Sequence, residues 1–134
     1  MMVVAEIPYK RAGDTQDRNV HIVIAENNAI TRRMIEMAIT SIGWTVDSAA
    51  DGVEALLAVE RAAGNLALVL ANISMPKMTG IELAKAMREI PSLSRVPVVL
   101  MGPPEQRPEA LAAGCSGFLA KPISMEALVE TLNL

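Results

Sequence analysis

The sequence is short of several residue types, and each shortage excludes a class of protein. Among its 134 residues there is one cysteine and one histidine, which excludes an internal disulfide, a multi-cysteine metal cluster and a histidine-rich metal site. Basic residues are fewer than acidic ones, with a formal net charge of -3, and this argues against a nucleic-acid-binding surface. No apolar run approaches the roughly 18 residues of a membrane helix, and the N-terminus has its apolar residues before its basic ones, the reverse of a signal peptide. We therefore expect a small, soluble, cytoplasmic protein.

Apolar residues are plentiful, at 51% of the chain, which is enough for the core of one domain at this length. Residues 1–19 differ from the rest, because residues 3–7 are briefly apolar and residues 9–19 are polar, charged and without a period. We predict a flexible N-terminal arm over residues 1–19 and a folded domain over residues 20–134. The alternative for the arm is conditional order, through docking on the domain or on a partner.

From residue 21 onward, apolar stretches alternate with helical patterns five times. The stretches are short and largely continuous, as in buried strands, and the helical patterns follow capping residues such as Asp51 and Thr79. This alternation predicts a flavodoxin-like, doubly wound α/β fold, in which a five-stranded parallel sheet, apolar throughout, carries helices on both faces. The predicted strands span residues 22–25, 44–49, 66–71, 96–101 and 116–120. The predicted helices span residues 29–42, 51–63, 79–89, 105–113 and 124–132.

Several apolar side chains are assigned to the core from their spacing or type. The first predicted helix carries such residues at helical spacing, namely Ile30, Met34, Ile35, Ala38 and Ile42. Three methionines are interpreted as core filling rather than as an adaptable binding groove, namely Met34, Met37 and Met87. Trp44 is expected to be packed, and Cys115 is expected to be a small buried hydrophobe rather than a redox thiol.

Polar residues or glycine follow four of the five predicted strands. Glu26 and Asn27 come after the first strand, Asn72 after the third, Gly102 after the fourth and Lys121, with Pro122, after the fifth. In doubly wound sheets the functional groups gather at the carboxyl ends of the strands. These residues are therefore the candidate site.

At this point a resemblance is visible. The segments IVIAENNAITRRM, LVLANISMPKMTGIEL, VPVVLMGP and AAGCSGFLAKPIS resemble the receiver domain of two-component response regulators, over residues 20 to about 132. The resemblance implies phosphoryl transfer: an acidic pair holds Mg²⁺, an aspartate accepts a phosphoryl group from a histidine kinase, and a hydroxyl residue and a lysine bind its oxygens. It also implies an aromatic switch residue, which matches Phe118, and a cis peptide bond between Lys121 and Pro122.

Carried onto this chain, most of the phosphoryl-transfer residues are missing. The acceptor position is Asn72, and a carboxamide has no anionic oxygen that could attack phosphorus. The acidic pair is Glu26 and Asn27, so the pocket has one carboxylate, and we expect Mg²⁺ binding to be weak or absent. Gly102 stands at the hydroxyl position and offers its backbone N–H alone. Because three positions depart together, we interpret the change as natural degeneracy rather than as one engineered substitution.

Two residues of the resemblance remain. Lys121 is expected to pair with Glu26 and to hydrogen-bond the carbonyl of Asn72, because a partly buried ammonium needs partners. The alternative is that Lys121 binds another anion. Phe118 lacks a hydroxyl and is expected to keep one packed rotamer.

The leading hypothesis is a degenerate receiver, which is a non-enzymatic interaction module that acts without phosphorylation. Its expected partners are a histidine kinase, another receiver or an attached output domain. The expected surface is the face of the fourth helix, fifth strand and fifth helix, over residues 105–132, which could also form a homodimer. Since the chain stops soon after Leu132, a domain cut from a longer protein and a stand-alone regulator are both open.

Two alternatives belong to other classes. One is a sensor of a small ligand such as a cyclic dinucleotide, a site that needs arginines and a stacking ring. Its candidate residues are Tyr9, Lys10, Arg11, Arg32, Arg33 and Arg107, although Arg32 and Arg33 could equally be a solvated face or a partner contact. The other is a receiver phosphorylated on another residue, Asp47 or Asp51, which the expected strand order keeps away from Lys121.

Overall fold

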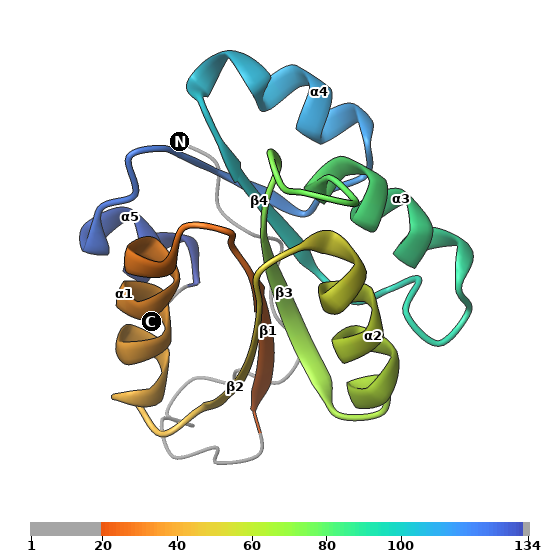
Figure 1. Ribbon diagram of the computed structural model, residues 1–134, viewed down its shortest axis with the longest axis horizontal. Helices are drawn as coiled ribbons and strands as arrows, with labels where there is room; N and C mark the ends of the chain where they lie inside the picture. Colours follow the sequence, from red (N-terminus) through yellow and green to blue (C-terminus); the bar gives the residue numbers. More distant parts are fainter. Residues whose placement is uncertain (1–19, 133–134) are drawn as a thin grey trace.

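The computed structural model describes residues 20–132, in which five parallel strands form one sheet in the order β2-β1-β3-β4-β5. Five α-helices alternate with the strands (Figure 1), so the predicted flavodoxin-like fold is confirmed. The strands are β1 (His21–Ala25), β2 (Thr45–Ala49), β3 (Leu66–Asn72), β4 (Val98–Gly102) and β5 (Gly117–Ala120). The helices are α1 (Ala29–Thr40), α2 (Gly52–Ala62), α3 (Gly80–Glu89), α4 (Arg107–Ala112) and α5 (Met125–Thr131), with a 3₁₀ turn, η1 (Pro104–Gln106), before α4.

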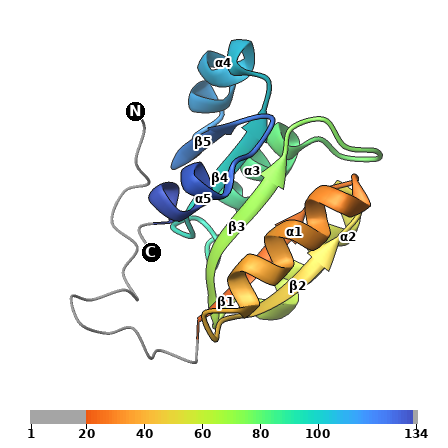
Figure 2. The same cartoon turned by 90° about the vertical axis from the view of Figure 1, so that its left-hand side faces the viewer.

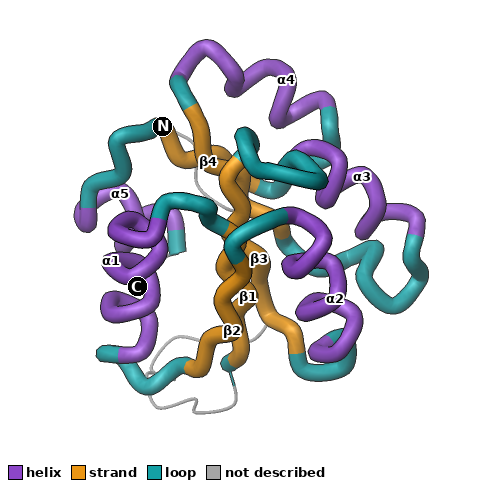
Figure 3. The backbone as a smooth tube through the Cα atoms, viewed as in Figure 1, coloured by secondary structure: helices purple, strands orange, loops and turns teal. Residues whose placement is uncertain are grey.

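The helices cover both faces of the sheet and enclose two apolar clusters. Helices α1 and α5 lie together on one face (Figure 2), where Ile35 and Leu128 are fully buried against the sheet. On the other face Ala58 of α2, Leu83 of α3 and Ala110 of α4 belong to the second cluster. Figure 3 shows the strands running between these two layers of helices. Burial on both sides explains the continuous apolar runs in the central strands.

Four of the helices begin at a side-chain cap placed shortly after a strand. Thr79 opens α3 with a complete capping box, in which Thr79 Oγ1 accepts from Glu82 N and Glu82 Oε1 accepts from Thr79 N. Asn28, Asp51 and Ser124 each accept a backbone N–H at the starts of α1, α2 and α5. The capping signals in the sequence therefore mark true helix starts.

The core face of α1 differs from the predicted one. Ile35 and Ile39 are buried, whereas Ile30 is 83% exposed, Met37 58% and Ile42 39%. Residues on a helix advance by about 100°, so Ile30 points about 140° away from Ile35. The spacing correctly predicted a helix, but Ile30 and Met37 lie on its exposed side, and Ile42, predicted as its last core residue, lies beyond the helix end at Thr40.

Strand β2 also departs from the prediction, because it is not apolar throughout. Thr45, Asp47 and Ser48 are exposed, and β2 pairs with β1 alone at the edge of the sheet. Trp44, just before the strand, is buried as predicted. The predicted arm, residues 1–19, lies outside the described residues.

The parallel strands bring the candidate site residues to the same end of the sheet, the end at which the strands finish. The chain passes from β1 to β2 on one side and then to β3 on the other, which makes the gap between β1 and β3 the switch point of the fold. The carboxyl ends of β1, β3, β4 and β5 meet there. Among residues 20–132, no helix is long and apolar enough to cross a membrane.

Candidate functional site

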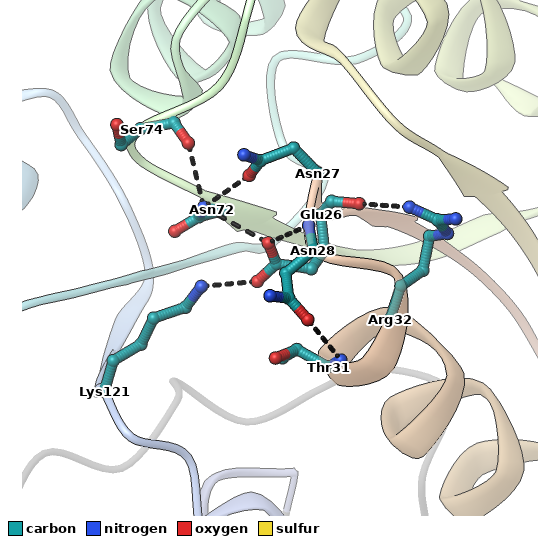
Figure 4. Close-up of polar contacts among 8 residues, drawn as sticks. All are labelled: Glu26, Asn27, Asn28, Thr31, Arg32, Asn72, Ser74 and Lys121. Carbon is teal, nitrogen blue, oxygen red and sulfur yellow. Dashed lines mark hydrogen bonds and ion pairs between the residues drawn. The ribbon is translucent and has the colours of Figure 1, made fainter.

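The carboxylate of Glu26 is the centre of the site and is completely buried. Its Oε1 lies 2.5 Å from Nζ of Lys121, whose side chain is 27% exposed. Its Oε2 accepts from the backbone N–H of Asn28 at 2.9 Å. The predicted ion pair between Lys121 and Glu26 is therefore present (Figure 4), and it leaves this part of the pocket with no net charge.

Asn72, the last residue of β3, directs its amide nitrogen at three oxygens. The distances from Asn72 Nδ2 are 2.9 Å to Asn27 Oδ1, 2.9 Å to the carbonyl of Ser74 and 3.3 Å to Glu26 Oε2. The predicted hydrogen bond from Lys121 to the Asn72 carbonyl is not among the contacts of the described residues. Instead, the two side chains meet through Glu26, because the carboxylate accepts from both (Figure 4).

Gly102, at the end of β4, has its surroundings filled by a residue that sequence reasoning missed. A Cβ on Gly102 would lie 2.8 Å from Gln106 Oε1 and 3.2 Å from Ile73 Cδ1, so a hydroxyl residue at this position would need both to move. Gln106 Oε1 is buried and has no hydrogen-bond partner in the described part of the chain. No pattern in the sequence points to Gln106, because its side chain reaches Gly102 only through the turn that η1 makes after β4.

Phe118 lies in β5, and Lys121 directly follows the strand. The peptide bond between Lys121 and Pro122 is cis, as the resemblance implied. Phe118 is buried, 3% exposed, and its ring lies 5.2 Å from Cζ of Arg107, a cation–π distance. Arg107 is the first residue of α4, and its guanidinium group covers the ring.

A shallow apolar pocket of about 560 Å³ opens beside the site. It lies between the start of α1 and the segments that follow β4 and β5, with Lys121 at its polar end. Its lining residues are Ile30, Thr31, Met34, Pro103, Lys121, Pro122 and Ile123.

The remaining candidates within residues 20–132 lie apart from one another and have partners. Arg32 donates to the carbonyl of Glu26 at 2.8 Å, and Arg33 lies on the exposed side of α1, 3.5 Å from Glu36. Asp47 contacts His21 at 3.1 Å on the edge strand β2. The strand order separates β2 from β5, as expected for Asp47. Tyr9, Lys10 and Arg11 lie outside the described residues.

Asp51 and Cys115 have shifted pKa values for ordinary structural reasons. The pKa of Asp51 is lowered, chiefly because its carboxylate accepts the N–H of Glu54 at the start of α2, with Lys77 at 3.4 Å adding to this effect. The pKa of Cys115 is raised, chiefly by burial. Cys115 is half-buried against the second cluster, and the raised pKa disfavours the reactive thiolate.

The resemblance implies a divalent cation at this pocket, and the residues do not fit one. Mg²⁺ favours anionic oxygen ligands in octahedral geometry, but the one carboxylate here is already paired with Lys121. Asn72 presents N–H hydrogens, which repel a cation, to the oxygens that could serve as ligands. Within residues 20–132 there is no group of three or more His, Cys, Asp or Glu side chains that could hold a metal ion.

Comparison with known proteins places this geometry in a family. A family model described as the response regulator receiver domain matches residues 22–133. The chain is 26% identical over 120 residues to the gliding motility regulatory protein of Myxococcus xanthus, covering 87% of this chain and 15% of that protein. It is 29% identical over 116 residues to the probable transcriptional regulator ycf29 of Porphyra purpurea, covering 84% and 54%. The chain therefore spans about half or less of the curated relatives it matches.

The chain is also similar to the solved structure of the chemotaxis response regulator CheY4 of Vibrio cholerae. Its TM-score is 0.78 at 30% identity, covering 85% of this chain and 96% of that chain. A receiver from Saccharomyces cerevisiae, Ssk1, solved together with the histidine phosphotransfer protein Ypd1, shares the fold with a TM-score of 0.75 at 24% identity, covering 81% and 83%.

Proposed function

The chain belongs to the response regulator receiver family of two-component signalling, and from this membership we propose that it is a degenerate receiver which regulates through protein–protein contacts and without phosphorylation. The observation that carries the proposal is the carboxamide of Asn72 at the end of β3. It replaces the nucleophilic carboxylate, and its nitrogen is engaged by Glu26, Asn27 and Ser74. A neutral amide in this position offers no nucleophile for phosphorus.

Two neighbouring features support the same proposal. The single carboxylate of the pocket, on Glu26, is neutralised by Lys121, and Gly102 has no hydroxyl that could bind a phosphoryl oxygen. The space beside Gly102 is taken by Gln106 and Ile73. A phosphoryl group would therefore find no acceptor and no hydroxyl ligand, so we propose that the domain is not an enzyme.

The proposed partners are proteins: a histidine kinase, another receiver, a second copy of this chain or an attached output domain. Sequence relatives include the sensor histidine kinase RcsC of Salmonella typhi, of which the aligned segment covers 13%. CheY of Borrelia burgdorferi and Ssk1, which share the fold, were solved in complex with CheX and with Ypd1. On the proposed face of α4, β5 and α5, the apolar side chains of Leu111, Met125 and Val129 are exposed.

Acetyl phosphate provides the decisive test, because it phosphorylates a competent receiver aspartate without a kinase. The full chain, incubated with acetyl phosphate and Mg²⁺, is expected to gain no phosphoryl group by intact-mass spectrometry. CheY4 of Vibrio cholerae, treated in parallel, serves as the positive control. Amide NMR spectra with Mg²⁺ and then beryllofluoride are expected to stay unchanged at Glu26, Asn72, Gly102 and Lys121. Stoichiometric phosphorylation of the chain would refute the proposal.

A further inference from the structure

Helix α1 carries an exposed apolar surface beside the shallow pocket. Ile30 is 83% exposed and Met37 58%, and seven residues, or about two turns, place them on the same side of the helix. Met34 lies between them and lines the pocket, whose lining continues to Pro122 and Ile123. We call these five residues the α1 patch. The outer side of a surface helix is ordinarily polar, so a patch of this kind marks a place where another segment binds.

The chain itself contains a segment that matches the α1 patch. Residues 3–7 (VVAEI) are apolar at Val3, Val4 and Ile7, and they precede the polar residues 9–19. These residues lie outside the described part of the chain. An apolar stretch next to a polar one gains free energy only if some surface buries it, and the α1 patch is such a surface.

The linker between the two is long enough. Residues 8–19 join this segment to Val20, and twelve extended residues span about 40 Å. Strand β1 has five residues and therefore rises by about 17 Å, and α1 begins four residues after it. A flexible connection of this length also keeps the segment at an effective concentration on the order of 1 mM. Even a weak contact would then be populated.

The charges beside the two segments have opposite signs. Lys10 and Arg11 follow residues 3–7 closely in the sequence. Helix α5 lies on the same face of the sheet as α1 (Figure 2), and its Glu126 and Glu130 are exposed. Within residues 20–132 neither of these carboxylates has an ion-pair partner. A basic pair brought to this face would therefore be attracted by unpaired acidic groups.

We infer that residues 3–7 dock on the α1 patch of the same molecule, with Lys10 and Arg11 toward the acidic side chains of α5. The inference decides between the two possibilities for the N-terminal arm, in favour of docking on the domain. It rests on the proposed function in one respect: a protein partner that binds at α1 must first displace residues 3–7, so the arm regulates access to this helix.

Oxidation of methionine by dilute hydrogen peroxide measures how well Met37 is covered, because exposed methionines form the sulfoxide readily. The full chain is oxidised, and the rate at each methionine is read by peptide mass spectrometry. Ile7→Asp is expected to raise the rate at Met37 about threefold, the change for an arm that is docked about two thirds of the time. Met78, which packs against the cluster on the other face, is the internal reference and should keep its rate.

Thr15→Asp is the matched control, since it adds the same charge in the polar part of the arm. It is expected to leave the rate at Met37 at the wild-type value. Ile30→Ser tests the contact from the side of the domain, at a side chain so exposed that folding is unaffected. It should raise the rate at Met37 as Ile7→Asp does. The double variant of Ile7→Asp with Ile30→Ser should show little further increase, because both changes remove the same contact.

Docking within one molecule also requires that the rate at Met37 does not depend on protein concentration. Equal rates at Met37 in the wild type, Ile7→Asp and Ile30→Ser would overturn the inference, because the arm would then not cover α1. A rate that falls as the protein is concentrated, and that Ile7→Asp leaves unchanged, would also overturn it and would identify a second copy of the chain as the occupant. Either result would leave the proposed function intact, since acetyl phosphate tests that separately.

Discussion

At the scale of single residues, the molecule depends on how one buried carboxylate is neutralised. Glu26 has no solvent contact, and its partners are the ammonium of Lys121, the backbone N–H of Asn28 and the amide of Asn72. Removing a charge of such a pair leaves the other unbalanced in a medium of low dielectric constant. Lys121 thus has a structural role, because it balances the buried charge of Glu26.

Replacing Lys121 by Met should therefore destabilise the protein. We expect a loss of about 2 kcal/mol in the free energy of unfolding, less than for a fully buried pair because the lysine side chain is 27% exposed. Urea unfolding at neutral pH measures it. The double variant Glu26→Gln with Lys121→Met should recover part of the loss, since no charge is then left unpaired. A Lys121→Met protein as stable as the wild type would contradict this account.

At the scale of elements, the helix caps position the site by fixing where each helix starts after its strand. Thr79 begins α3 seven residues beyond the end of β3, and Gly80 then packs so closely that an added Cβ would lie 2.3 Å from the carbonyl oxygen of Asn72. Asp51 caps α2 and contacts Lys77 of the loop between β3 and α3. These caps hold the loops that carry Asn72 and Ser74.

The cap at Asp51 predicts a pH dependence. Its pKa is lowered in the folded protein, chiefly by the N–H of Glu54, so its stabilising effect is present above the unfolded pKa of about 3.9 and is lost as the pH falls through the folded value. Asp51→Ala should lower the thermal midpoint at pH 7 by a few degrees, and the deficit should shrink below about pH 4. Thermal scans of both proteins across this range give the comparison.

Ser124→Ala is the control for this prediction. Ser124 caps α5 with an uncharged hydroxyl, which accepts from Ala127 N at 3.0 Å. Its deficit should not depend on pH over the same range. A constant deficit for Asp51→Ala would mean that its charge does not contribute.

At the scale of the whole molecule, one sheet joins two apolar clusters into a single folding unit. Leu83 lies in the cluster beneath α2, α3 and α4, whereas Trp44 lies in the cluster beneath α1 and α5. Because the central strands contribute side chains to both clusters, a substitution that destabilises the packing on one face should also destabilise the other face. Small domains of this kind usually unfold in one cooperative step.

Leu83→Ala tests that cooperativity. The side chain is fully buried, so we expect a loss of about 3 kcal/mol from transfer and cavity terms. Urea unfolding followed by Trp44 fluorescence and by far-UV circular dichroism should shift equally, although Trp44 is on the opposite face. Leu57→Ala, at a site on α2 that is 53% exposed, should cost less than about 0.5 kcal/mol. Two separate transitions for Leu83→Ala would show that the faces unfold independently.

The sequence by itself determined the order of the elements, the parallel fold and the positions of Glu26, Asn72, Gly102 and Lys121 at one edge. These follow from local signals: continuous apolar runs, capping residues and the rule that the ends of parallel strands gather together. Sequence also predicted the pairing of Lys121 with Glu26, because a buried ammonium needs a carboxylate and one was available.

Only the tertiary structure decided how these residues are connected. The amide of Asn72 donates to a backbone carbonyl, that of Ser74, which no side-chain pattern can reveal. Gln106 fills the space beside Gly102, because η1 turns it back over β4. The side of α1 that faces the core was likewise misjudged at Ile30, since the position of a helix on its sheet depends on contacts between distant segments. Such contacts are properties of the packed chain, and local sequence does not contain them.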